Sequence, residues 1–178
     1  MARHEQTQRR GRPRRRRWTK GASVAGVVVI AVAVGYFAYR AQADLPGQKL
    51  PSQGNLHVNT TSEPHEPYNS TPPTSGPHLP YIAPWGVHTK PIVDELQVHN
   101  LEDGGVMVQY NCDCPELVDK LAGVVRRYDR YVILAPYPTM KSRIALTAWT
   151  RLETLDDFDA ARIERFIKAY RGIDHHPR

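Results

Sequence analysis

The sequence predicts an α+β fold, with a single extracytoplasmic domain built on a mainly antiparallel sheet with two helices, preceded by one N-terminal transmembrane helix. Three observations lead to this prediction. An apolar run follows a dense cationic block near the start of the chain, a polar Pro-rich stretch comes next, and β-type and helical runs then follow one another to the end. The predicted parts are a basic cytoplasmic tail at 1–20, a transmembrane helix (signal anchor) at 21–39, a linker at 40–54 and the domain at 55–178.

The net charge of +6 belongs to the beginning of the chain and not to the predicted domain. Residues 1–39 hold nine Lys and Arg against the single acid Glu5, a balance of +8. Residues 40–178 hold fifteen Lys and Arg against seventeen Asp and Glu, a balance of −2. The domain therefore lacks the electrostatic footprint of a nucleic-acid binder, and we expect no nucleic-acid partner.

The apolar run from Gly21 to Ala38 has about eighteen residues, near the lower limit for a helix that crosses a bilayer. The arginines before it predict that the N-terminus stays in the cytoplasm and that the domain lies outside, on a single-pass anchor in the cell membrane. Two alternatives remain open. Ala41-Gln42-Ala43 resembles a signal-peptide cleavage site, and the paired arginines before Trp18 weakly resemble a twin-arginine export signal. All three interpretations place the domain outside the cytoplasm.

The stretch from Asp44 to Pro84 is rich in Pro, Ser, Thr, Asn and Gly. Asp44 to Gln53 indicates a spacer that lifts the domain from the membrane. A disordered continuation is one interpretation of His57 to Pro84, since polar Pro-rich chains bury little apolar surface. Its aromatic residues and three histidines favour the other interpretation, a rigid loop whose prolines confine the backbone.

The first predicted strand is Ile92 to Val98, and Val106 to Tyr110 is the second. Between them lies His99-Asn100-Leu101-Glu102-Asp103-Gly104-Gly105, where Asp-Gly between apolar runs indicates a hairpin. An imidazole and two carboxylates would then sit at a hairpin tip, accessible to a solute.

A helix is predicted after Asp113, with Asp113 as its N-cap and Pro115 in its first turn. Two further strands are predicted at Tyr131 to Ala135 and Ile144 to Trp149. A last helix is predicted to begin at an Asp156 cap and to end at Gly172. The simplest packing of these elements places both helices on one face of the sheet.

A metal site is the chemistry that the residues of the domain favour. Imidazole, carboxylate and thioether groups outside the cytoplasm are a ligand set for copper or zinc. His78 ends a Pro-stiffened loop that can fold back over the turn, and Met140 or one terminal histidine could complete the set. Because adjacent residues of an extended chain point in opposite directions, at most one of His175 and His176 should join a given site. The candidate ligands are His78, His99, Glu102, Asp103, Met140 and His175.

Other interpretations of these residues stay open. His78 and His99 could be structural fasteners in an envelope protein-interaction module that binds no metal. Glu102 or Asp103 beside His99 could act as a general base in a small hydrolase, but Ser75 lacks a nucleophile-elbow motif, and we expect no enzyme. Cys112 and Cys114 could form a disulfide, a redox pair or a Cu(I) clasp.

Several motifs together resemble the bacterial family DUF3105, over roughly residues 50–178. The resemblance rests on His57-Val58, Tyr68-Asn69-Ser70, Pro72-Pro73-Thr74-Ser75-Gly76-Pro77-His78, Trp85-Gly86-Val87, His99-Asn100-Leu101-Glu102, Cys114-Pro115-Glu116-Leu117, Ala135-Pro136-Tyr137-Pro138, Ala145-Leu146-Thr147-Ala148-Trp149 and His175-His176-Pro177. It implies a membrane-anchored or exported domain, commonly actinobacterial, and supplies no function. The family pattern has His where this chain has Asp103, an exchange that would make a metal site there harder.

Overall fold

The computed structural model describes residues 18–176, and within its first helix the side chains of residues 26–37 and 40. Residues 1–17 of the predicted basic tail lie outside the described residues. The chain divides into two compact units, Met1–Leu45 and Pro46–Arg178. The first contains one helix, α1 (Trp18–Ala43), which includes the predicted anchor segment. Among the described residues, no helix has the length and apolarity that a membrane crossing requires.

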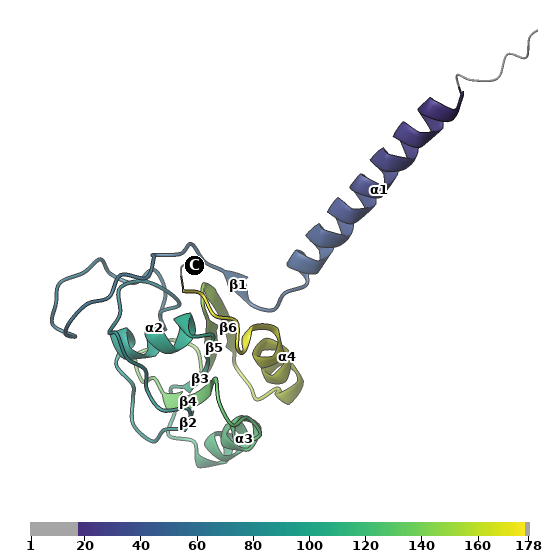
Figure 1. Ribbon diagram of the computed structural model, residues 1–178. Coiled ribbons are helices and arrows are strands. Elements are labelled where there is room, and N and C mark those ends of the chain that lie inside the picture. The colour runs from purple at the N-terminus through teal and green to yellow at the C-terminus, as the bar shows by residue number, and fades with distance from the viewer. Residues whose placement is uncertain (1–17, 177–178) are drawn as a thin grey trace, which may run out of the picture. The chain divides into compact units, whose positions relative to one another are not determined.

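The second unit is an α+β domain, as predicted, around a six-stranded sheet of order β1-β6-β5-β3-β4-β2 (Figure 1). The sheet is mixed. Strands β1, β6, β5 and β3 pair antiparallel in that order, whereas β4 pairs parallel with both β3 and β2. The strand bounds are β1 Gln48–Lys49, β2 Gly86–Val87, β3 Val106–Tyr110, β4 Val132–Pro136, β5 Ile144–Ala148 and β6 Arg151–Leu155.

Helices cover both faces of this sheet, and the prediction of helices on a single face is wrong. Figure 1 shows α2 (Asp94–Glu102) on one side, and α3 (Pro115–Val125) and α4 (Ala160–Tyr170) on the other. All five residues of β5 are buried, which a strand achieves only when both of its faces are covered. Leu101 of α2 packs against Met107 and Ile133 of the sheet in one apolar cluster.

The Pro-rich segment from His57 to Pro84 is ordered, as the rigid-loop interpretation predicted. Residues 72–79 are all buried, including the polar side chains of Thr74, Ser75 and His78. The segment is tied to the sheet by the backbone of Thr150, whose N–H donates to the Thr74 carbonyl at 2.9 Å. It lies on the same face of the sheet as α2, because its Leu79 N–H donates to the carbonyl of Glu95 at 3.0 Å.

The predicted strand Ile92–Val98 and the hairpin that should follow it are wrong, because most of these residues, Asp94–Glu102, form α2. Six consecutive residues from Gln97 to Glu102 are buried, since the sheet covers one side of the helix and the Pro-rich segment the other. A helix buried all round has no polar face, so its sequence carries no helical periodicity. Asp103-Gly104 is the C-terminal end of this helix, where Gly104 has the positive φ of +84°.

Other boundaries differ in detail. Cys114 and Asp159 occupy the N-cap positions of α3 and α4, in place of the predicted Asp113 and Asp156. The Asp159 carboxylate accepts the Arg162 N–H, as a capping residue does. Strand β6 was not predicted. The cysteines Cys112 and Cys114 form a disulfide with Cα atoms 5.4 Å apart, so neither is free to bind metal.

Candidate metal centre

The last turn of α2 supplies three polar groups to one place in the domain. His99 and Glu102 are spaced three residues apart and therefore lie on the same face of the helix, and Asp103 follows at its C-terminal end. Glu102 is fully buried and His99 is 8% exposed. A carboxylate taken out of water needs hydrogen bonds, a cation or a proton to compensate for lost hydration.

Two further histidines come from the ordered segment that crosses this end of α2. His57 and His78 form an isolated parallel bridge. The Val58 N–H donates to the His78 carbonyl at 2.8 Å, and the His78 N–H donates to the Leu56 carbonyl at 2.9 Å. The backbone thus fixes the two rings beside each other, with His78 fully buried and the His57 side chain 46% exposed.

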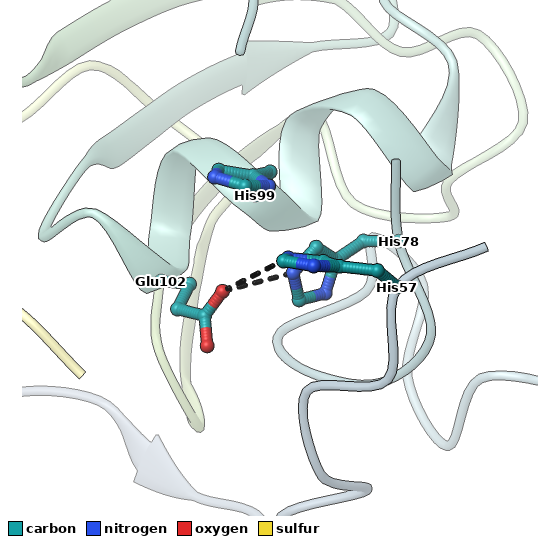
Figure 2. Close-up of side chains that lie close together, drawn as sticks. All are labelled: His57, His78, His99 and Glu102. Atoms are coloured by element: carbon teal, nitrogen blue, oxygen red, sulfur yellow. Dashed lines mark hydrogen bonds and ion pairs between the residues drawn. The ribbon is translucent and has the colours of Figure 1, made fainter. Parts of the chain in front are cut away.

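The four side chains converge on a common point (Figure 2). Glu102 Oε2 lies 2.9 Å from His78 Nε2 and 3.9 Å from His57 Nε2. Each of His57, His78, His99 and Glu102 offers one ligand atom, and these atoms all lie within 4.8 Å of one another. The rings of His57 and His99 are parallel with centroids 5.2 Å apart, and His78 meets both of them edge-on. Such a group of donors could hold one metal ion.

The backbone sets the tautomers of the two buried histidines. His78 Nδ1 lies 2.7 Å from the Gly76 carbonyl and His99 Nδ1 lies 2.6 Å from the Leu79 carbonyl. A carbonyl oxygen only accepts, so both Nδ1 atoms carry the hydrogen. In a neutral imidazole the lone pair is then on Nε2, which is the atom directed toward the other members of the cluster. Histidine ligands of metals are held in this way in many proteins.

One contact in the cluster is unfavourable as it stands. A neutral His78 directs the lone pair of Nε2 at a carboxylate oxygen of Glu102 only 2.9 Å away. A proton or a metal ion between these atoms would make the contact attractive. Burial lowers the pKa of His78 and so disfavours the added proton, although hydrogen bonding to Gly76 and the charge of Glu102 act in the opposite direction. Asn55 satisfies the other oxygen of Glu102 by donating from Nδ2 at 2.8 Å.

A second group overlaps the first on its exposed side. His99, Asp103 and His176 also bring three ligand atoms within 4.8 Å of one another. His176 Nε2 lies 3.7 Å from Asp103 Oδ1 and 3.4 Å from Glu102 Oε2. The Asp103 and His176 side chains are 30% and 39% exposed, so this group faces solvent.

The candidate ligands expected from the sequence divide into two sets. The structure brings together His78, His99 and Glu102, with Asp103 at the edge of the same cluster. Met140 lies in a separate apolar cluster with Tyr137 and Ala145 and belongs to neither group. His175 also belongs to neither group: its ring stacks on Trp149, with centroids 5.9 Å apart.

Two members of the cluster, His57 and His176, were not among those candidates. Sequence spacing could not connect them to α2, because they lie far from it in the chain and reach it through tertiary contacts. Both occur in motifs that carry the family resemblance, His57-Val58 and His175-His176-Pro177, and that was the signal available. The two adjacent histidines have different partners, as expected: the ring of His175 stacks on Trp149, whereas His176 Nε2 faces Glu102.

Three surface pockets of the domain lie away from the histidine cluster. One of about 510 Å³ is lined by residues around the start of α3, among them Cys114, Lys120 and Arg143. Two others, of about 570 and 330 Å³, are lined by residues outside the histidine cluster.

The fold and this site define an α+β domain with a buried histidine–carboxylate cluster. A family model described as a protein of unknown function, DUF3105, matches residues 57–178, which is more than half of the chain. The chain therefore belongs to the DUF3105 family. No curated protein and no solved structure matches it.

Proposed function

We propose that this domain binds a transition-metal ion, zinc or copper, through His57, His78, His99 and Glu102. The observation that carries the proposal is the convergence of three imidazoles and one carboxylate within 4.8 Å, two of the imidazoles having Nδ1 bonded to a backbone carbonyl. The bare cluster leaves a lone pair of neutral His78 against Glu102, and an ion there would turn that repulsion into two bonds.

The donor types favour zinc or Cu(II) over Cu(I). Three nitrogens and one oxygen suit tetrahedral Zn²⁺, and imidazole also suits Cu(II). Among the described residues, the sulfur donors that Cu(I) prefers do not join the cluster: Met107 and Met140 are packed in the core and both cysteines are in a disulfide. The burial of Glu102 and His78 favours retention of the ion over rapid exchange with bulk water.

Calorimetric titration of zinc and Cu(II) into the full chain and two single variants tests the proposal. We expect His78→Ala and His99→Ala each to weaken binding at least tenfold, about 1.4 kcal/mol, because each removes one donor. His88→Ala is the matched control, since His88 bonds the Pro84 carbonyl outside the cluster. Its binding should equal that of the parent.

Thermal melts without metal separate ligation from a structural role. If the His78 and His99 variants bind as the parent does but melt far lower, the imidazoles are structural fasteners. The proposal then fails, and the alternative of an envelope protein-interaction module replaces it. Loss of binding in variants that still melt cooperatively supports the metal centre.

We further propose that the domain lies outside the cytoplasm, held by the segment 21–39 as a single-pass anchor. The finding that no described helix meets the requirements of a membrane crossing does not cover the side chains of residues 21–25, 38 and 39. The arginines before Gly21 support this orientation, and so does the Cys112–Cys114 disulfide, because disulfides persist in oxidising compartments. A reporter that is active only outside the cytoplasm, fused after Arg178, should be active. Activity of cytoplasmic reporters alone would contradict this orientation.

A further inference from the structure

The outer group of His99, Asp103 and His176 has the features of a metal position in its own right. His176 Nδ1 lies 2.7 Å from Asp174 Oδ1, a carboxylate oxygen that accepts its hydrogen. The lone pair of a neutral His176 is then on Nε2, which faces Asp103 and Glu102. A carboxylate behind the imidazole is the arrangement that orients many zinc-bound histidines and makes them more basic.

The segment that carries His176 is held against the end of α2 by its backbone. The Gly172 N–H donates to the Gly104 carbonyl at 2.7 Å, and the His175 N–H donates to the Glu102 carbonyl at 2.9 Å. The first of these bonds requires a close approach, because a Cβ on Gly104 would lie 2.6 Å from the Ile173 nitrogen. The placement of His176 over the cluster is therefore built into the fold.

The two groups share His99, and one imidazole nitrogen binds one metal ion. His99 can therefore be a ligand in only one of the two positions at a time. His99 has one Nε2 lone pair, and its Nδ1 is occupied by the Leu79 carbonyl. Three of the four inner donors, His78, His99 and Glu102, are buried, whereas both residues that the outer group adds, Asp103 and His176, are partly exposed. An ion that exchanges one ligand at a time can move between them while His99 stays bound.

We propose that His99, Asp103 and His176 form a second, solvent-facing position for the same metal ion, which enters and leaves the inner position through it. This inference rests on the proposed metal-binding function. It assigns His176 a role in capture and transfer rather than in holding the ion at equilibrium. One ion per chain occupies the inner position preferentially, because that position offers four donors against three.

The test is a double-variant cycle on the full chain, with Co²⁺ as the probe because its visible absorption reports the number and type of its ligands. His57 is half-exposed, so His57→Ala removes an inner donor with little risk to the fold. We expect His57→Ala to weaken Co²⁺ binding about tenfold, and His176→Ala alone to change it less than about threefold. In the His57→Ala background, where the ion depends on the outer position, His176→Ala should weaken binding at least a further tenfold.

Three other results of these titrations would contradict the proposal, each in a different way. An equal loss from His176→Ala in both backgrounds would make it a plain fifth ligand of one site and overturn the second position. If His176→Ala leaves Co²⁺ affinity unchanged in both backgrounds, His176 does not bind the metal ion. Failure of the parent to bind Co²⁺, zinc or Cu(II) would instead overturn the proposed function. His57→Ala combined with His88→Ala is the control, and it should bind as His57→Ala alone does.

A kinetic measurement on the same proteins supports or contradicts the transfer role. We expect His176→Ala to slow both the loading of Co²⁺ and its removal by excess chelator at least about fivefold, because the stepwise path through the outer position is lost. Faster removal in His176→Ala would show that His176 only shields the inner ion, and the transfer role would then be wrong. Asp174→Asn should fall between parent and His176→Ala, because the amide oxygen still accepts from Nδ1.

Discussion

Each end of α2 carries a carboxylate withdrawn from water, Asp94 half-buried and Glu102 fully buried, and the two carboxylates have opposite kinds of neighbours. At the N-terminal end, Asp94 accepts the Tyr137 hydroxyl at 2.9 Å and the Gln97 side-chain amide at 2.6 Å. Gln97 in turn accepts from Gln109 at 2.7 Å. At the C-terminal end, Glu102 accepts from Asn55 but faces the nitrogens of three histidines, His57, His78 and His176.

The difference separates a structural polar cluster around Asp94 from the proposed metal site around Glu102. Around Asp94 each bond joins a donor to an acceptor, so the carboxylate already has compatible partners. Burial raises the pKa of Asp94, while the bonds from Tyr137 and Gln97 lower it. Around Glu102 the neutral imidazole of His78 presents an acceptor to an acceptor, and only a cation or a proton completes the group. Buried polar groups with incompatible partners are therefore a more specific sign of a metal site than burial alone.

Acid should affect the Glu102 end of α2 most. We expect zinc affinity to fall at least about tenfold between pH 7 and 5, because protons compete for the imidazole lone pairs. Without metal, burial lowers the pKa of His78 below its ordinary value of 6.5. The stability that this shift contributes is present above pH 6.5 and is lost as the pH falls toward the pKa of the folded state.

Titration calorimetry and metal-free melts across this pH range measure both effects. The pKa of His176 is raised, chiefly by its hydrogen bond to Asp174, so it contributes stability below pH 6.5 and loses it as pH rises. That ring is exposed, and we expect its effect to be the smaller one. Asp94→Asn is the control, because Asp94 lies outside the histidine cluster. Its zinc affinity should fall between pH 7 and 5 by the same factor as that of the parent. A zinc affinity independent of pH would contradict imidazole ligation.

Removing a donor from the Asp94 end should affect stability and leave metal binding unchanged. Tyr137→Phe deletes the hydroxyl that Asp94 accepts, and we expect it to lower the free energy of unfolding by about 1–2 kcal/mol. Urea unfolding of the metal-free protein measures this loss. Zinc affinity at pH 7 should equal that of the parent. If it falls tenfold, the two ends of α2 are coupled and the contrast between them does not hold.

The smallest expected effect comes from Asp103, the position where the family pattern has His. Asp103→His should retain binding within about threefold, since the inner donors stay in place. Its selectivity should shift toward Cu(II), because an imidazole replaces a hard carboxylate in the outer group. Competition titrations with zinc and Cu(II) measure the shift. An unchanged preference would show that Asp103 does not contact the ion.

The sequence predicted the α+β class, the ordered Pro-rich segment and both helices after Asp113. It failed at α2, where burial on every side removes the periodicity on which such predictions depend. Burial on both faces also explains why the arrangement of the sheet was not predicted. Strands β3, β4 and β5 are covered on both faces and lack a regular alternation of apolar and polar residues. Neither the parallel pairing of β3 with β4 nor the helix layer on each face could therefore be deduced.

The candidate site was predicted only in part, because some of its members are distant from one another in the sequence. His99 and Glu102 are close in sequence, and His78 was inferred from a loop that folds back. His57 and His176 reach the cluster through long-range backbone bonds, the first through its bridge to His78 and the second through His175 and Glu102. Periodicity and spacing report neighbours along the chain, so contacts of this kind are outside their scope.

The position of Glu102 also has a mechanical meaning. Asn55 and His57, which follow β1 in the chain, and His176, the last described residue, all meet this one side chain. An ion bound between them would fasten the Pro-rich segment and the C-terminal segment to each other and to α2. Pulling on the C-terminal end would then load a metal–ligand bond before it loaded the sheet. A domain tethered by one end to a surface would gain resistance to force and to proteases that begin at frayed ends.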